Sequence, residues 1–252
     1  MTPHPTNVPV LLERLVRAAE RRGLAIDELG FVGGAPILLL RPKITCPGPQ
    51  LLVAAGFHGE EPAGCWGVLH HLESSDHDEG VNVSFLPLVN PTGIRAGRRE
   101  NDWAENPNCD FCHTESGVPS PSREGKILLD AIDRLLPRAH DGFLSLHEDI
   151  DLDRFYVYSF EQSTAPGSFS KALVDVESQF FEPVSDGPFC GAIVCGGVIF
   201  SECDGSFEDF LFHNGVPRTA CTETPGALPF EKRVQANSAI IRAFRQFHSV
   251  QT

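Results

Sequence analysis

The chain has 252 residues, 41% of them hydrophobic, which suits one large α/β domain spanning residues 1–252. It carries 20 basic against 34 acidic residues, and such an acidic surface repels phosphate backbones and anionic lipid heads, so neither nucleic acids nor membranes are expected partners. No segment approaches the ~20 apolar residues of a membrane helix, and the polar residues 1–7 lack the apolar stretch of a secretory signal, so a cytoplasmic location is expected.

The N-terminal part of the sequence predicts a helix followed by two short strands. Apolar residues recur every three or four positions over residues 8–22, with Thr6 or Asn7 as the N-cap and Gly23 as the terminator. Two strands, joined by a turn at Gly33-Gly34, are then expected at residues 28–32 and 36–40.

A buried strand and a polar turn come next. Residues 50–57 are almost wholly apolar and do not alternate, which indicates a strand buried on both faces. Pro62 suits the first turn of a helix over residues 63–72, where its missing N–H costs nothing. Another strand is expected at residues 81–88. Residues 90–123 are rich in Asn, Pro, Gly, Ser and Cys without periodicity, and a loop of this length is usually functional.

The C-terminal part alternates helices and strands. Helices are expected at residues 124–136, 168–180, 206–213 and 231–248, the first of them capped by Ser122. Strands are expected at residues 142–146, 155–160 and 216–222. This order predicts an α/β fold with a mixed, mostly parallel central sheet and helices on both faces.

Four residues that can bind a metal or move a proton follow the expected strands. His58 and Glu61 come after the first buried strand, His147 directly after residue 146, and Glu223 directly after residue 222. In open α/β sheets, ligands bind at the carboxyl ends of the strands. The four side chains are therefore expected to form one site.

Two histidines and one carboxylate are the ligands of a catalytic zinc site that keeps its fourth position for water. Zinc lowers the pKa of bound water from 15.7 to roughly 7. Glu223 fits the role of the general base that takes the proton of this water and passes it to a leaving nitrogen. The oxyanion that forms needs a cation, for which an arginine is suited.

Four blocks of the sequence, in this order, resemble the zinc carboxypeptidase family (carboxypeptidase A-like metallopeptidases), especially compact bacterial members such as murein peptide amidases. The blocks are residues 56–61, residues 90–93 with Arg99 and Asn101, residues 146–148, and residues 222–225. The resemblance implies one Zn²⁺ per chain on His58, Glu61 and His147, with Glu223 as the base. It also implies that Arg99, two positions before Asn101, polarises the scissile carbonyl, and that Asn101 and Asn106 orient the substrate.

The sequence departs from that family in the groups that hold a substrate's terminal carboxylate. Pro107 stands where relatives carry an arginine, and proline cannot bind a carboxylate. Arg95, Arg154 and Arg218 are candidate replacements, and the sequence does not choose among them. The tyrosine of a late substrate-covering loop has no match either, because the only tyrosines are Tyr156 and Tyr158.

Two enzyme functions remain open from the sequence. One is hydrolysis of a peptide or peptide-like amide. The other is hydrolysis of N-acyl amino acids, as in succinylglutamate desuccinylase and aspartoacylase, whose zinc pattern is similar. Those relatives carry a β-rich domain after the catalytic glutamate, whereas 29 residues follow Glu223 here, which favours the peptidase. A third class, a binding protein without activity, is disfavoured because every ligand and the base are present. The substrate and the oligomeric state are not defined.

Several cysteines and carboxylates have no role in this interpretation. Without an export signal, the eight cysteines are expected to be reduced thiols. Cys109 and Cys112, followed by His113, match a haem-attachment spacing, but no second C-x-x-C completes a structural zinc site. The spare carboxylates of Glu60, Glu148 and Asp149 leave a second metal open, and Asp149 is also a candidate partner for a ligand histidine.

Overall fold

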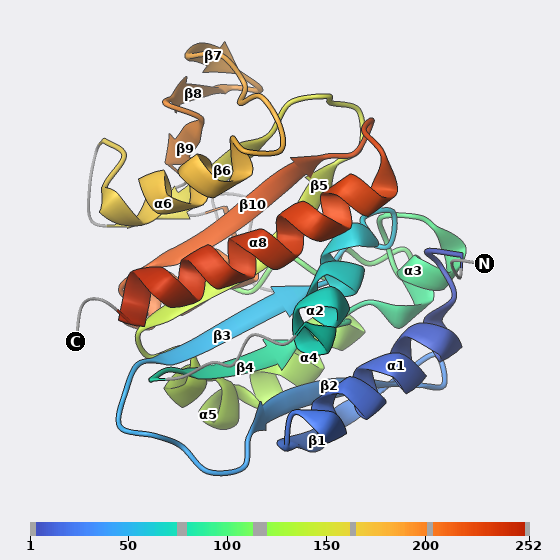
Figure 1. The fold of residues 1–252 in the computed structure, drawn as a ribbon. Coiled ribbons are helices and arrows are strands. Elements are labelled where there is room, and N and C mark those ends of the chain that lie inside the picture. The colour runs from blue at the N-terminus through green and yellow to red at the C-terminus, as the bar shows by residue number, and fades with distance from the viewer. Residues whose placement is uncertain (1–3, 75–79, 113–119, 162–164, 201–203, 250–252) are drawn as a thin grey trace.

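The computed structural model describes residues 4–74, 80–112, 120–161, 165–200 and 204–249. In these residues ten strands form one sheet, in the order β1-β2-β4-β3-β5-β10-β6-β9-β8-β7 (Figure 1). The strands are β1 (Leu24–Val32), β2 (Ala35–Pro42), β3 (Gln50–Ala55), β4 (Asn82–Leu86), β5 (Gly142–Asp149), β6 (Tyr156–Phe160), β7 (Gly187–Phe189), β8 (Ala192–Cys195), β9 (Val198–Phe200) and β10 (Thr219–Pro225).

The centre of the sheet is parallel and its flanks are largely antiparallel. Strands β4, β3, β5 and β10 are neighbours that run in the same direction. β1, β2 and β4 pair antiparallel on one side, and β10 and β6 pair antiparallel on the other. The predicted α/β class, with a mixed sheet and helices on both faces, is confirmed, and the sheet is parallel at its centre.

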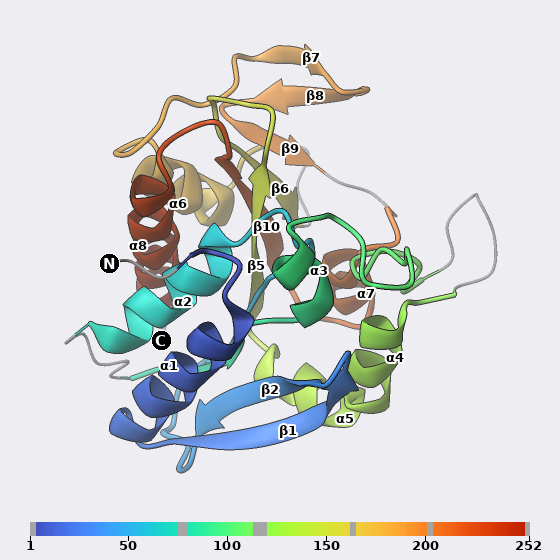
Figure 2. The same ribbon diagram turned by 90° about the vertical axis from the view of Figure 1, so that its right-hand side faces the viewer.

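Helices cover both faces of the sheet, as the view along its central strands shows (Figure 2). One face packs against α1 (Val8–Arg21), α2 (Ala63–Glu73), α6 (Ser168–Glu177) and α8 (Phe230–Ser249). The other face packs against α4 (Arg123–Asp130), α5 (Ile132–Leu135) and α7 (Phe207–His213).

The apolar run in β3 divides between these two cores. Leu51 and Val53 belong to the first core, and Leu52 and Ala54 belong to the second. Every other side chain of the strand therefore faces one set of helices, and the remaining ones face the other set. Each fully buried Leu or Val contributes roughly 1.5–3 kcal/mol by leaving water. This explains why the sequence of the strand shows no alternation.

The predicted helix starts are confirmed by their capping contacts. The Asn7 side chain accepts a hydrogen bond from the Val10 amide at 3.2 Å at the start of α1. The Ser122 hydroxyl accepts one from the Gly125 amide at 3.0 Å at the start of α4. The single helix expected at residues 124–136 is instead two helices, α4 and α5, followed by a 3-10 turn at Leu136–Arg138.

Two predicted strand ends are corrected. β5 continues to Asp149 and β10 to Pro225, because the parallel pairing between them extends to these residues. His147 and Glu223 thus lie within the last part of their strands and not after them. Only His58 and Glu61 follow a strand end, in the turn between β3 and α2.

Further differences concern short elements. The long segment expected to be a loop contains α3 (Pro91–Ala96), which Asn90 caps through the Gly93 amide. Strands β7, β8 and β9 extend the sheet beyond β6, although three- and four-residue strands carry too few positions for a periodic signal. Among the described residues, no helix has both the length and the apolar character needed to cross a bilayer.

Candidate metal centre

His58, Glu61 and His147 converge at the carboxyl end of the parallel strands. The Nδ1 atoms of the two histidines lie 3.2 Å apart. The Glu61 oxygens lie 2.8 Å from the His58 Nδ1 and 2.7 Å from the His147 Nδ1. The three side chains come together because β3 and β5 are adjacent in register, so the turn after β3 lies beside the end of β5.

The tautomer of His58 is fixed by Asn106. The Asn106 Oδ1 accepts a hydrogen bond from the Asn108 amide at 3.0 Å, which identifies this atom as the oxygen. The His58 Nε2 lies 3.1 Å from the same oxygen and must therefore donate to it. Its Nδ1 then carries a free lone pair directed at Glu61 and His147.

Glu208 faces the opposite nitrogen of His147. The Glu208 Oε1 lies 3.7 Å from the His147 Nε2 and accepts a hydrogen bond from the Ser145 hydroxyl. The Glu208 Oε2 accepts a bond from the Asn108 Nδ2 at 3.1 Å. A carboxylate beside Nε2 favours a proton there, although the Asn108 Nδ2 also lies 3.5 Å from this nitrogen; the Nδ1 of His147 faces the Glu61 carboxylate at 2.7 Å.

These side chains fit a single divalent metal. Two ligands ~2.05 Å from one zinc ion in tetrahedral geometry lie roughly 3.3 Å apart, close to the observed separation of the Nδ1 atoms. Without a proton or cation between them, two nitrogen lone pairs and a carboxylate would repel one another. All three residues are at least 95% buried, so water cannot relieve this repulsion.

Arg99 lies beside this cluster, on the loop after α3. Its Nη1 is 3.4 Å from Glu61 Oε1 and 3.8 Å from Glu60 Oε1. The Arg99 carbonyl accepts hydrogen bonds from the Gly59 amide at 3.3 Å and from the Asn90 Nδ2 at 3.2 Å. These two bonds tie the arginine to the turn that carries the ligands, while its guanidinium remains half exposed.

A cavity of about 250 Å³ opens onto the cluster. Glu223 lines it from β10, where it is the register partner of His147 on β5. The other lining side chains are those of His58, Arg99, Asn106, Asn108, Cys109, His147, Tyr158, Phe160, Asp204, Ser206, Glu208 and Cys221. The cavity thus joins the three metal-ligand candidates to the expected base and the expected arginine.

The charges of the site shift one another's pKa values. Burial would raise the pKa of the Glu61 carboxyl, but the imidazoles of His58 and His147 outweigh it and hold that pKa well below its usual range. Burial opposes the charge on His147, yet the Glu61 carboxylate raises its pKa above the usual value. Burial and, second, the Glu61 charge raise the pKa of Glu223 to about 8.

Comparison with known proteins agrees with this geometry. The succinylglutamate desuccinylase/aspartoacylase catalytic domain family matches residues 47–153. A crystal structure of a "putative metallopeptidase" from Shewanella amazonensis SB2B is 41% identical, covering 97% of this chain and 94% of that chain with a TM-score of 0.92. One of the same name from Shewanella denitrificans OS217 is 40% identical, covering 97% and 92%, with a TM-score of 0.91.

The chain belongs to the same family as these putative metallopeptidases. A metallo-carboxypeptidase from Burkholderia cenocepacia shares the fold at 18% identity, covering 95% of this chain and 68% of that chain, with a TM-score of 0.71. No curated protein matches the chain. The family is one of hydrolases, and the chain is a member of that general kind.

Some residues expected at a site of this family lie elsewhere. Asn101 is fully buried, and its amide donates to the carboxylates of Glu105 and Glu124, so it does not reach the cavity. The three arginines proposed as replacements for the family's carboxylate-binding arginine are also outside the lining. Arg95 donates to the Gly33 carbonyl, Arg154 pairs with Glu182, and Arg218 lies over the Phe247 ring.

Two of the three carboxylates considered for a second metal make hydrogen bonds or ion pairs with other parts of the fold. Glu148 accepts a hydrogen bond from the Ala63 amide at 2.6 Å, at the N-terminus of α2, and pairs with Arg233 of α8. Asp149 accepts a bond from the Tyr156 hydroxyl at 3.0 Å. Asp149 therefore has a different partner from the ligand histidine expected for it.

Sequence reasoning missed Glu208, Asn108 and Tyr158. Tyr158 lines the cavity from β6, because that strand pairs antiparallel with β10 and places Tyr158 opposite Cys221. No motif links these positions to the ligands in the sequence. Glu208 lies in the helix predicted at residues 206–213. The sequence did not indicate which part of the molecule that helix would contact.

Among the described residues, neither Cys109 nor Cys112 belongs to a group of three or more side chains that could hold a metal ion. Cys112 donates to the Asp209 carboxylate at 3.1 Å, and His113 lies outside the described residues. A second group within reach of one cation is His147, Glu208 and Cys221. It shares His147 with the first cluster, and the imidazole nitrogen that faces Glu208 is Nε2.

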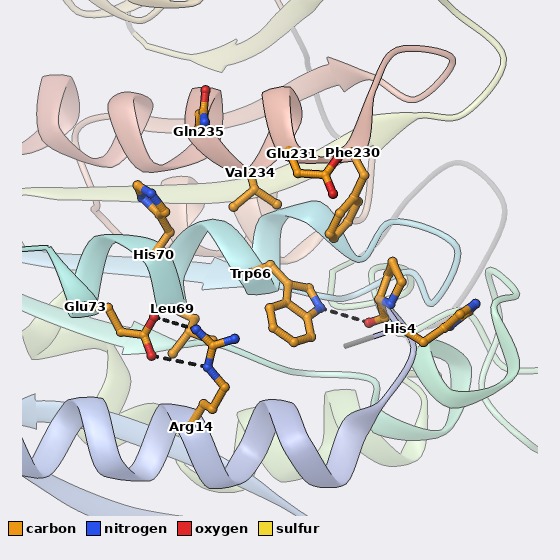
Figure 3. A pocket seen from close by; sticks show the side chains of 11 residues that line it. His4, Arg14, Trp66, Leu69, His70, Glu73, Phe230, Glu231, Val234 and Gln235 are labelled. Atoms are coloured by element: carbon orange, nitrogen blue, oxygen red, sulfur yellow. Dashed lines mark hydrogen bonds and ion pairs between the residues drawn. The ribbon is translucent and has the colours of Figure 1, made fainter. Parts of the chain in front are cut away.

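A larger cavity, of about 430 Å³, lies away from this centre between α1, α2 and α8 (Figure 3). Its walls include Trp66, whose Nε1 donates to the Pro5 carbonyl at 2.9 Å. Arg14 and Glu73 form an ion pair at 2.6 Å at its edge. None of the predicted site residues lines it, so the smaller cavity is the candidate active site.

Proposed function

We propose that the chain is a zinc-dependent hydrolase that cuts a peptide or peptide-like amide bond. The observation that carries this proposal is the convergence of His58 Nδ1, His147 Nδ1 and the Glu61 carboxylate at a cavity also lined by Glu223 and Arg99. Two nitrogens and a carboxylate oxygen are a ligand set typical of catalytic zinc with an open fourth position. One ion per chain is expected.

Each side chain of the site has a task that its position supports. Zinc, when bound, supplies a Lewis acid and lowers the pKa of a water ligand. Glu223 takes a proton from the attacking water and delivers it to the leaving nitrogen. The Arg99 guanidinium donates hydrogen bonds to the oxygen of the scissile carbonyl as negative charge develops on it. Asn106 and Glu208 hold the two imidazoles in the ligand tautomer.

A second candidate function is hydrolysis of N-acyl amino acids. It is supported by the match of residues 47–153 to the succinylglutamate desuccinylase/aspartoacylase catalytic domain, which includes all three candidate ligands. Assays of peptides and of N-acetyl and N-succinyl amino acids separate the two functions. Release of acetate or succinate without cleavage of any peptide would establish the second function in place of the first.

The test of the proposed chemistry is the pair of wild type and Glu223→Gln. Elemental analysis should find about one zinc per chain in both proteins. The variant should lose hydrolysis by a factor on the order of 10²–10⁴, because it keeps the shape but not the base. Undiminished turnover in Glu223→Gln would remove Glu223 from the mechanism, and absence of zinc from both proteins would refute the proposed metal.

A further inference from the structure

We infer that the part of the substrate entering the site cavity carries a positive charge, such as an ammonium group, and no carboxylate. The inference rests on the proposed amide hydrolysis, because it names the substrate class of the same site. It follows from an account of every cation in the chain and from the carboxylates that line the cavity.

All 20 Lys and Arg residues lie in described parts of the chain, since the segments outside the description contain none. Of these 20, Arg99 is the one that lines the cavity. Arg99 is already 3.4 Å from Glu61 and is assigned to the scissile carbonyl. A substrate carboxylate in the cavity would therefore have no second basic side chain to pair with.

The arginines nearest to Arg99 in sequence are engaged outside the cavity. Arg98 pairs with Asp102 at 2.7 Å, and Arg123 pairs with Glu105 while lying over the Trp103 ring. Moving either one to the cavity would break an existing ion pair. Pro107 occupies the position of the family's carboxylate-binding arginine and has no polar side chain.

Among the described residues, the lining carries three carboxylates, those of Asp204, Glu208 and Glu223. Glu208 faces His147 and Glu223 is the proposed base, so Asp204 is the carboxylate of this set that has no task in the proposed reaction. Asp204 is exposed, and its Oδ1 accepts a hydrogen bond from the Ser206 amide at 2.9 Å, which holds the carboxylate in place. A unit charge 4 Å from another changes binding about fivefold even in bulk water, and more at the lower dielectric of a cavity.

The reaction itself produces a cation in this cavity. Water adds its oxygen to the carbonyl carbon, the C–N bond breaks, and the leaving nitrogen takes protons to become an ammonium. The products are a carboxylate on the acyl side and an amine on the leaving side. Acidic lining favours the amine side, so the leaving amine and any further positive charge on it should lie toward Asp204.

Three matched amides test this. They share an N-benzoylglycyl acyl group, and their leaving amines are 1,5-diaminopentane, hexylamine and 6-aminohexanoate. Each amine has five methylenes and ends in an ammonium, a methyl or a carboxylate. With the zinc-loaded full chain, kcat/KM should fall in that order, by about fivefold or more at each step. Binding of the three free amines, measured by calorimetry, should follow the same order.

Asp204→Asn provides the matched variant, since its amide oxygen can still accept from Ser206. It should bring the ammonium-to-methyl ratio close to one without altering zinc content. Asp186→Asn is the control, because Asp186 is exposed, accepts from the Gly196 amide at 2.7 Å and lies outside the cavity lining; it should leave the ratio unchanged.

Equal or better cleavage or binding of the carboxylate compound overturns the inference, as does equal binding, or no binding, of all three amines. The proposed function fails separately. If none of the amides is hydrolysed but the amines still bind in the expected order, the preference for positive charge is supported. In that case the proposed hydrolysis of such amides is refuted.

Discussion

Each of the two candidate ligand histidines has a polar side chain from another segment beside its Nε2, the ring nitrogen that faces away from the cluster. Asn106 contacts the Nε2 of His58, and Glu208 contacts that of His147. A histidine with two free nitrogens would divide its population between tautomers and ring orientations. A proton on Nε2 of both rings would direct both Nδ1 lone pairs to one point and so remove part of the cost of organising the site when a metal binds.

Glu208→Gln should therefore weaken zinc binding by roughly 10-fold or more, the size of effect usual for a partner of a metal ligand. The glutamine keeps the shape but removes the charge that holds the proton on Nε2. Zinc affinity should be measured by competition with a chelator. Glu231→Gln is the control, because Glu231 is an exposed glutamate in the first turn of α8, as Glu208 is in the first turn of α7. Equal zinc affinity of all three proteins would show that Glu208 does not position His147.

At the scale of elements, hydrogen bonds connect the turn after β3, which carries His58 and Glu61, to the loop after α3, which carries Arg99 and is called the arginine loop below. Asn90 donates to the carbonyls of Phe57 and Arg99 and caps α3 with its side-chain oxygen. It thereby joins the end of β3 to the loop that carries Arg99. Gly59 allows the two segments to touch, since a Cβ at this position would overlap the backbone of Gly93 and Arg98.

Gly59→Ala should displace the arginine loop, lower stability by about 1–3 kcal/mol and reduce hydrolysis more than the loss of folded protein explains. Urea unfolding and kcat/KM at equal folded fraction measure the two effects. Gly34→Ala is a useful comparison, because it has open space but a φ of 78° in the β1–β2 turn. Gly34→Ala should lose stability through backbone strain alone, and a similar loss of activity in both variants would contradict the role of Gly59.

A second element-scale contact joins β1, β2 and α5. The Asp27 carboxylate accepts hydrogen bonds from Arg41 at 2.7 Å and from Arg134 at 2.8 Å. The bond from Arg41 is the largest of the effects that together hold the pKa of Asp27 below its usual value.

A lowered folded-state pKa means that Asp27 stabilises the fold above its unfolded pKa of about 3.9, and that this contribution disappears as the pH falls through the folded pKa. Asp27→Asn should thus cost up to about 1 kcal/mol near pH 7, since the contact is partly exposed, and nothing at the lowest pH at which the fold persists. Urea titrations of both proteins from pH 7 downward check this. A difference that does not shrink with falling pH would contradict it.

The sequence predicted those features that depend on neighbouring residues. The caps at Asn7 and Ser122, the buried strand β3 and the turn after it follow from local spacing, and the structure has them. Glu208 and Tyr158 could not be predicted, because their approach to the cavity depends on how α7 packs on the sheet and on the antiparallel pairing of β6 with β10. Asn101 is the opposite case: it matches the family's motif, but in the structure its side-chain amide donates to Glu105 and Glu124 and does not face the cavity.

At the scale of the whole molecule, the parallel centre of the sheet determines where chemistry can occur. The strands β3, β5 and β10 run the same way, so their carboxyl ends deliver His58 with Glu61, His147 and Glu223 to one edge. Residues more than 80 positions apart, such as His58 and His147, thereby share one cavity. An ion bound there links the turn after β3 to β5, and so it binds only the folded chain.

Removing zinc should consequently lower the stability of the whole molecule. A ligand that binds the folded state alone, at 100 times its dissociation constant, stabilises that state by about 2.7 kcal/mol. For a chain of this size each kcal/mol corresponds to roughly 2–4 °C, so adding zinc to chelator-treated protein should raise Tm by about 5–10 °C. His147→Ala lacks one ligand and should show little shift, whereas Asp186→Asn should match the wild type. An equal Tm with and without zinc in the wild type would mean that these three side chains do not hold the ion in the folded chain.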